Sequence, residues 1–553
     1  MSMRRNARVG LVVGTVVGTV ALLAACSSGS DDSQSSQPEN TEPQMTEPVV
    51  AETTTPTTSI MPTTSTPDTT PTTTVSSCGP ITPTPAEPST VGEVTVDGPI
   101  QTGNGAAVIT PPSFDVTTVG YVQEEYFISG TASAYSSASP LQPDGCWTVE
   151  PTAPEPYTTR ILVRRPADPA AFSGTVNVEW LNVTAGFDAS PDWTIAHTEM
   201  IRSGDAWVGV SAQTVGINGR EGALVPLALK IADPVRYEPL DHPGDSYSYD
   251  MFSQAGAAVR TQASMLLGGV QPEHLIAMGQ SQSAFRLTTY VNAVAPIANV
   301  YDGYLLHSRG ARGAALSEDP LAEVAAPDPA LIRTDLGVPV LQALSETDLV
   351  GDRLGFATAR QPDTDFIRTW EMAGTSHQDL YGLGIGDADD GSGAADTALF
   401  AAMSVPVSDL YGGVISCGAP INAGPLTYVM RSAVASLESW VVTGQPPASM
   451  PQIEIDDAGA IVVDDRGIAI GGIRTPHVDV PIARLSGLGQ PESDNFCGLF
   501  GTTTPFDAAA LGLLYPDQDA FVTAWNASVD SAVASGAVMA ADAQRLEDVA
   551  AAG

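Results

Sequence analysis

Three segments of the chain carry the residue types that acyl-transfer chemistry needs: a serine, a histidine and a carboxylate. Ser281 lies in the pentapeptide 279–283 (Gly-Gln-Ser-Gln-Ser), between an apolar run at 274–278 and the stretch 284–290. This pattern predicts a strand, a tight turn and a helix, with the serine at the apex of the turn. Such a turn exposes the hydroxyl and is typical of the nucleophile elbow, usually written Gly-x-Ser-x-Gly. Here a serine takes the last position, so the motif needs support from the rest of the chain.

The histidine and the carboxylate occur in the order that this chemistry requires. A serine hydroxyl is a weak nucleophile at neutral pH and needs a base, together with an acid that orients the base. In α/β hydrolases the chain order is serine, acid, histidine. His377 lies in the loop directly after the last predicted strand and is the candidate base, whereas His307, in an apolar run, is interpreted as structural. Asp348 follows the preceding predicted strand and is favoured as the acid, with Glu346 as the alternative.

The developing oxyanion needs two N–H donors, and the sequence suggests a source for each. One is the backbone of Gln282, directly after the candidate nucleophile. The other is expected in the loop after the predicted strand 175–180, where Asn182 or Leu181 is the candidate. Ser283 takes the place of the usual last glycine, and its small size should still let the helix pack close to the strand.

Three further residues are candidates for contact with a substrate. Asp188 and Trp193 follow the predicted oxyanion loop and are candidates for a pocket wall. The alternatives are a capping aspartate and a core tryptophan. Arg474 follows two glycines and is a candidate for binding an anionic group, while the alternative is a structural arginine paired with an acid.

Alternating strands and helices must position these residues. Two stretches, 125–132 and 157–165, alternate polar and apolar residues as antiparallel outer strands do. More continuously apolar runs then predict buried parallel strands at 175–180, 206–211, 275–278, 304–307, 338–344 and 366–372. Apolar residues at helical spacing lie between them, at 192–204, 251–267 and 285–293. The sequence therefore predicts an α/β fold with a doubly wound, mostly parallel sheet.

Two stretches interrupt the alternation and predict lid-like insertions, near 215–248 and 378–420. A C-terminal extension follows. It is predicted to contain a helix at 426–444, short strands and turns at 451–485, and Ala-rich helices at 507–551.

The N-terminal segment has the features of an export signal. Residues 1–26 combine a basic start with a short apolar stretch and end in Leu-Ala-Ala-Cys, which favours a cleaved signal peptide over a spanning helix. The ending resembles a bacterial lipobox, in which Cys26 is lipidated. Residues 27–90 are rich in Thr, Ser and Pro and are predicted to be a disordered tether, followed by the folded domain at 91–553. We therefore expect a lipid-anchored protein at the cell membrane, outside the cytoplasm.

The chain has five cysteines. If Cys26 is lipidated an even number remains, and in an exported chain this predicts disulfides. The sequence does not fix the pairing. The pairs nearest in sequence, Cys78–Cys146 and Cys417–Cys497, are preferred. A metal site is not expected, because no histidines lie near these cysteines at ligand spacing.

The charge of the chain limits its partners. The net charge of −40 and pI of about 4.1 exclude nucleic acid as a partner. The expected chemistry requires no cofactor. The expected partners are a small-molecule or lipid ester and a membrane, the latter reached through Cys26. The oligomeric state stays open.

Five motifs together resemble those of a bacterial family known only as "alpha/beta hydrolase domain" proteins. They are Val-Glu-Trp-Leu-Asn-Val (178–183), Gly-Gln-Ser-Gln-Ser (279–283), Ser-Glu-Thr-Asp (345–348), Gly-Thr-Ser-His (374–377) and Gly-Gly-Ile-Arg-Thr-Pro (471–476). The resemblance runs from about residue 95 to the end of the sequence. It implies an α/β-hydrolase fold with Ser281, Asp348 (or Glu346) and His377 in the triad positions, but it implies no substrate.

Taken together, these patterns predict a membrane-anchored serine hydrolase that acts on carboxylic esters through an acyl-enzyme. Two alternatives remain. One is a catalytically silent lipoprotein of the same fold that binds a lipid or glycan, for which Ser281 would lie far from His377. The other is an amidase or peptidase with the same residues.

Overall fold

The computed structural model describes most of the chain from Cys78 onward, namely residues 78–79, 91–109, 114–221, 223, 226–491 and 496–553. The predicted signal peptide, the predicted lipidation site Cys26 and nearly all of the predicted tether lie outside the described residues. No helix within the described ranges is both long enough and apolar enough to cross a membrane.

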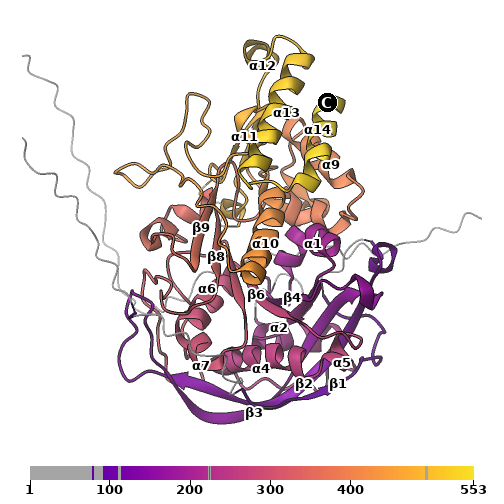
Figure 1. The fold of residues 1–553 in the computed structure, drawn as a ribbon, viewed down its shortest axis with the longest axis vertical. Coiled ribbons are helices and arrows are strands. Elements are labelled where there is room, and N and C mark those ends of the chain that lie inside the picture. The colour runs from indigo at the N-terminus through magenta and orange to yellow at the C-terminus, as the bar shows by residue number, and fades with distance from the viewer. Residues whose placement is uncertain (1–77, 80–90, 110–113, 222, 224–225, 492–495) are drawn as a thin grey trace, which may run out of the picture. The chain divides into compact units, whose positions relative to one another are not determined.

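A nine-stranded sheet forms the centre of the fold, in the order β1-β2-β3-β5-β4-β6-β7-β8-β9 (Figure 1). From β5 to β9 the strands are parallel, and β1, β2, β3 and β5 pair antiparallel. The fold class predicted from the sequence is therefore confirmed. The strands are β1 (Thr95–Asp97), β2 (Tyr121–Ser136), β3 (Glu150–Pro166), β4 (Thr175–Trp180), β5 (Ala206–Val210), β6 (His274–Gln280), β7 (Gly303–His307), β8 (Val340–Ser345) and β9 (Ile367–Met372).

Burial explains the two kinds of strand pattern. Every residue of β4, β5, β7 and β8 is buried, as expected for parallel strands that are covered on both faces. The antiparallel strand β2 mixes buried and exposed positions and forms a long pair with β3. Because β4 lies between β5 and β6, the loops after β4 and β6 leave the same edge of the sheet side by side. Such a switch in strand order is where open α/β sheets place their sites.

Helices cover the sheet and continue into a helical C-terminal region (Figure 1). Helices α1 (Pro191–Ser203) and α10 (Leu426–Thr443) pack against each other over β6, and α6 (Gln282–Thr289) packs on β6 and β7. The longer remaining helices are α4 (Ser248–Thr261), α9 (Ala394–Ser404), α12 (Ala508–Leu514), α13 (Gln518–Ala534) and α14 (Ala540–Ala552). Short helices are α2 (Thr214–Asn218), α3 (Leu229–Ala232), α5 (Ala263–Leu266), α7 (Ala295–Ala298), α8 (Glu346–Leu349) and α11 (Pro476–Asp479).

The two predicted insertions contain more helix than the sequence pattern indicated. The first holds α2 and α3. The second begins with a π-helical turn, Tyr381–Ile385, and includes all of α9. It also contains the strand pair β10 (Asp409–Leu410) and β11 (Ile415–Ser416), while β12 (Ala483–Ser486) pairs with β13 (Thr502–Pro505) farther along. The sequence pattern missed α9 because the acidic and glycine-containing stretch 386–393 stands directly before it and dominates the local composition.

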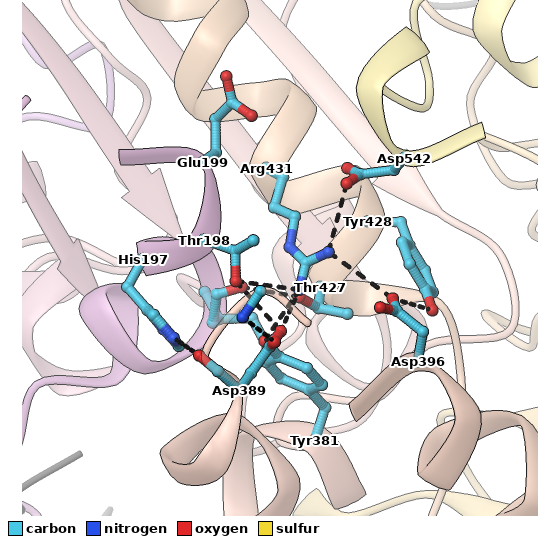
Figure 2. A network of polar contacts seen from close by, with 12 residues as sticks. His197, Thr198, Glu199, Tyr381, Asp389, Asp396, Thr427, Tyr428, Arg431 and Asp542 are labelled. Carbon is cyan, nitrogen blue, oxygen red and sulfur yellow. Dashed lines mark hydrogen bonds and ion pairs between the residues drawn. The ribbon is translucent and has the colours of Figure 1, made fainter. Parts of the chain in front are cut away.

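A buried arginine joins the C-terminal helices to the body of the domain (Figure 2). Arg431 of α10 is fully buried, and its Nη2 lies 2.6 Å from the Oδ2 of Asp389. Its Nη1 lies 3.8 Å from Asp396 of α9 and 3.5 Å from Asp542 of α14. Removing one member of a buried ion cluster costs about 3–5 kcal/mol, because the other charges remain desolvated. We call these four side chains the Arg431 cluster.

Two disulfides are formed, Cys78–Cys146 and Cys417–Cys497, which are the pairs preferred from the sequence. The first joins a residue of the predicted tether to the segment between β2 and β3.

Candidate active site

Ser281 lies at the tight turn between β6 and α6. Its backbone has φ 58° and ψ −120°, which is a strained conformation for a residue with a side chain. A Cβ added to Gly279 would lie 3.0 Å from the Cβ of Ser283, so the two ends of the pentapeptide pack closely. Both positions must therefore be small, and the serine at the last position meets that requirement.

The side chains of Ser281, His377 and Asp348 form one hydrogen-bonded chain. The Nε2 of His377 lies 2.8 Å from the Oγ of Ser281, and its Nδ1 lies 2.6 Å from the Oδ1 of Asp348. All three residues are buried, with Ser281 only 8% exposed. This is the arrangement in which an imidazole can take a proton from a serine while a carboxylate stabilises the imidazolium.

Local hydrogen bonds hold the acid and the base in place. The second oxygen of Asp348 accepts from the N–H and the hydroxyl of Ser345, at 2.7 and 2.8 Å, which closes a capping box at the start of α8. The N–H of His377 donates to the Oγ1 of Thr347, and its carbonyl accepts from the Nε2 of Gln280 at 3.2 Å. The loops after β6, β8 and β9 are thus tied to one another.

Glu346 holds loops together instead of bonding the histidine. Its carboxylate accepts from the N–H groups of Gly374 (2.6 Å) and Gly487 (2.8 Å). Burial raises the pKa of Glu346, against the effect of these hydrogen bonds. Of the two acids proposed from the sequence, the structure brings Asp348 to His377.

The backbone around Ser281 offers N–H groups for an oxyanion. The N–H of Gln282 is at the start of α6, where helical N–H groups have no intrahelical acceptor. The N–H of Asn182 donates to Ala189 at 2.9 Å, and that of Leu181 donates to Val210 at 3.2 Å. Within the described residues the N–H of Val183 has no acceptor, which makes it the candidate second donor.

A family profile described as "Alpha/beta hydrolase domain" matches residues 96–548. The chain belongs to the alpha/beta hydrolase domain family. No curated protein matches the chain.

Solved structures of hydrolases resemble this alpha/beta hydrolase domain only distantly. A thermostable esterase from Pseudomonas putida is 13% identical, with 52% of this chain and 82% of that chain covered and a TM-score of 0.27. An α/β serine hydrolase without a lid from Xanthomonas campestris is 14% identical, with 40% and 80% covered and a TM-score of 0.25.

The other residues proposed for the substrate pocket of this alpha/beta hydrolase domain are engaged in internal contacts. The Oδ2 of Asp188 lies 2.6 Å from Arg160 and accepts from Ser211. Trp193 is buried, with the Arg164 guanidinium 4.5 Å from its ring centre. The side chain of Arg474 pairs with Asp479 at 2.5 Å and also donates to two backbone carbonyls.

Two glutamines that the sequence patterns did not single out are hydrogen-bonded to the region of the elbow at Ser281. Gln280 precedes it in β6, and its carbonyl accepts from the Nδ2 of Asn182 at 2.9 Å. Gln213, from the loop after β5, accepts from the side chain of Gln282 at 2.8 Å. The position of Gln280 inside the pentapeptide was a usable signal. Gln213 had none, because only the tertiary fold brings the β5 loop to the elbow.

Proposed function

We propose that this alpha/beta hydrolase domain is a serine hydrolase that cleaves carboxylic esters through an acyl-enzyme. The observation that carries the proposal is the hydrogen-bonded chain from Ser281 through His377 to Asp348. A silent protein of this fold was expected to hold Ser281 apart from His377, and the 2.8 Å contact favours a working site.

The proposed mechanism follows from the order of these contacts. His377 takes the proton of Ser281 as its Oγ attacks the ester carbonyl, and Asp348 stabilises the resulting imidazolium. The N–H groups of Gln282 and Val183 would bind the tetrahedral oxyanion. His377 then protonates the departing alcohol. In the second half, His377 deprotonates a water molecule that attacks the acyl carbonyl. The protonated His377 then returns the proton to the Oγ of Ser281 as the carboxylic acid leaves.

We further propose that the enzyme works outside the cytoplasm, attached to the membrane by a lipidated Cys26. The signal-like pattern of residues 1–26 supports this, together with the two disulfides of the described domain. Incorporation of a labelled fatty acid into the protein in its host, with Cys26→Ala as the comparison, tests the anchor. Equal incorporation into both would contradict it.

A fluorophosphonate probe tests the hydrolase itself, because such probes react with an activated serine. The wild type should be labelled and should hydrolyse p-nitrophenyl esters of graded acyl length, whereas Ser281→Ala should do neither. Labelling that persists in Ser281→Ala would overturn the proposal. An anilide with the same acyl group, measured in parallel, separates an esterase from an amidase.

A further inference from the structure

A chain of polar side chains runs from the first turn of α6 into the neighbouring loops, beside Ser281. The Nε2 of Gln282 donates to the Oε1 of Gln213 at 2.8 Å. The Nε2 of Gln213 in turn donates to the Oδ2 of Asp245, also at 2.8 Å, and the same oxygen lies 3.1 Å from the Nη2 of Arg286. The proposed acyl-transfer steps use the backbone of Gln282 but none of these side chains.

The hydrogen-bond partners of Gln213 fix the orientation of two side-chain amides, those of Gln213 and Gln282. The indole N–H of Trp180 can only donate, and it lies 3.1 Å from the Oε1 of Gln213. The carboxylate of Asp245 accepts from the other end of the same amide. Gln282 must therefore present its NH₂ to Gln213, which leaves its Oε1 as an acceptor. That oxygen is buried and has no donor within the described residues.

Unused donors accompany this unused acceptor. Arg286 lies four residues after Gln282, so the two side chains are neighbours on one face of α6. Arg286 is only 6% exposed and its guanidinium lies 5.9 Å from the ring centre of Tyr249, but its Nε and Nη1 make no hydrogen bond of good geometry in the part of the chain that the structure describes. Its Nη2 contacts two carboxylates, Asp245 and Glu318. One positive and two negative charges leave the group negative, which disfavours an anionic ligand.

We infer that Gln282 and Arg286, held by Gln213 and Asp245, form a polar subsite for a hydroxyl group of an uncharged substrate. A hydroxyl can donate to the Oε1 of Gln282 and accept from an Arg286 N–H at the same time, whereas an amide N–H can only donate. Gln282 directly follows Ser281, and we place this hydroxyl in the alcohol part of the ester that Ser281 attacks. The inference rests on the proposed function and gives its substrate class: esters of a polyol or sugar, rather than of a simple alkyl alcohol.

Two butyrate esters of equal chain length test the subsite. One is 2,3-dihydroxypropyl butyrate and the other is propyl butyrate, and both are followed by titration of the released acid at constant pH. We expect the wild type to prefer the dihydroxy ester in kcat/KM by about tenfold, the scale of one added hydrogen bond. Gln282→Met should bring the ratio close to one, because the methionine side chain has a similar length but offers no amide oxygen.

The same substitution at an exposed glutamine provides the matched control. Gln544 of α14 is exposed, and Gln544→Met should keep the wild-type ratio. Fluorophosphonate labelling of each variant reports whether its site is intact. If the wild type is labelled and cleaves both esters with equal kcat/KM, the subsite is wrong while the hydrolase stands. A preference that survives in labelled Gln282→Met also overturns it. Absence of labelling in the wild type counts against the proposed function itself.

Discussion

His377 and His307 each share a hydrogen bond with a buried aspartate, but their second nitrogens have different surroundings. The Nδ1–Oδ1 distance is 2.6 Å between His377 and Asp348, and 2.8 Å between His307 and Asp192. The Nε2 of His377 meets the Ser281 hydroxyl. The Nε2 of His307 is buried without a hydrogen-bond partner among the described residues.

The two histidines come from different kinds of segment. His307 is the last residue of β7, and its carbonyl accepts the N–H of Ser281 at 2.9 Å. His377 lies in the loop after β9 and reaches the same serine with its side chain. The strand thus supports the elbow through its backbone, while the loop delivers the reacting group. A His–Asp pair is therefore not a sign of catalysis until its free nitrogen is traced to a nucleophile.

Replacing each histidine in turn gives the largest expected contrast. His377→Gln should lower kcat/KM for a p-nitrophenyl ester by about 10⁴- to 10⁶-fold, the range seen when the base of such a triad is removed. His307→Gln should stay within about tenfold of the wild type, because its backbone carbonyl is kept. Folding of both variants is checked by circular dichroism. Loss of turnover in folded His307→Gln would contradict the division of roles.

The two acids of the β8 loop give the next contrast. Asp348→Asn should lower kcat by about 10⁴-fold, since an amide cannot hold the required imidazole tautomer. Glu346→Gln should affect thermal stability more than turnover, because Glu346 bonds loop N–H groups. Steady-state kinetics and a thermal melt of each variant separate the two effects. The reverse pattern would make Glu346 the acid.

Gln280 connects the two histidine–aspartate pairs. It lies next to His307 in the sheet register, and its side chain donates a hydrogen bond to the His377 carbonyl. Gln280→Met should loosen the histidine loop without touching the substrate. We expect kcat to fall by about ten- to a hundredfold with KM little changed, because small displacements of a catalytic group are costly. An increase in KM at constant kcat would instead place Gln280 in substrate binding.

The smallest effect concerns Asp379, a further carboxylate beside His307. Burial raises its pKa to about 7, and the hydrogen bond from the Gly382 N–H and, to a smaller extent, the His307 ring oppose this shift. A carboxyl group that holds its proton more tightly when folded contributes most stability at low pH and loses it as the pH rises from about 4 towards 7. The melting temperature of Asp379→Asn, taken relative to that of the wild type, should therefore be higher at pH 8 than at pH 4.

The control for this pH effect is Asp548→Asn, at an exposed position of α14. Its melting temperature should follow that of the wild type at both pH values. If Asp379→Asn also follows the wild type in parallel, the carboxyl group of Asp379 titrates normally in the folded protein.

The sequence predicted which loops carry the reacting residues better than it predicted the contacts around those residues. Strand ends and the loops that follow them can be located from apolar runs, so Ser281, Asp348 and His377 were found as candidates. The direction of a side chain within a loop depends on tertiary partners. For this reason the sequence left Asp348 and Glu346 open and preferred Asn182, whose N–H is already bonded in the fold. The Arg431 cluster carried no local signal either, because its members come from four separate segments.

The Arg431 cluster has a consequence for how the domain unfolds. Its charges come from α9, α10, α14 and the segment around Asp389 (Figure 2). If one of these segments unfolds, a buried charge in the others therefore loses its partner. Local openings of a protein usually follow its weakly connected parts. Here the helices near the end of the sequence are electrostatically tied to the body, and we expect them to exchange their amide protons together with it rather than as a frayed tail.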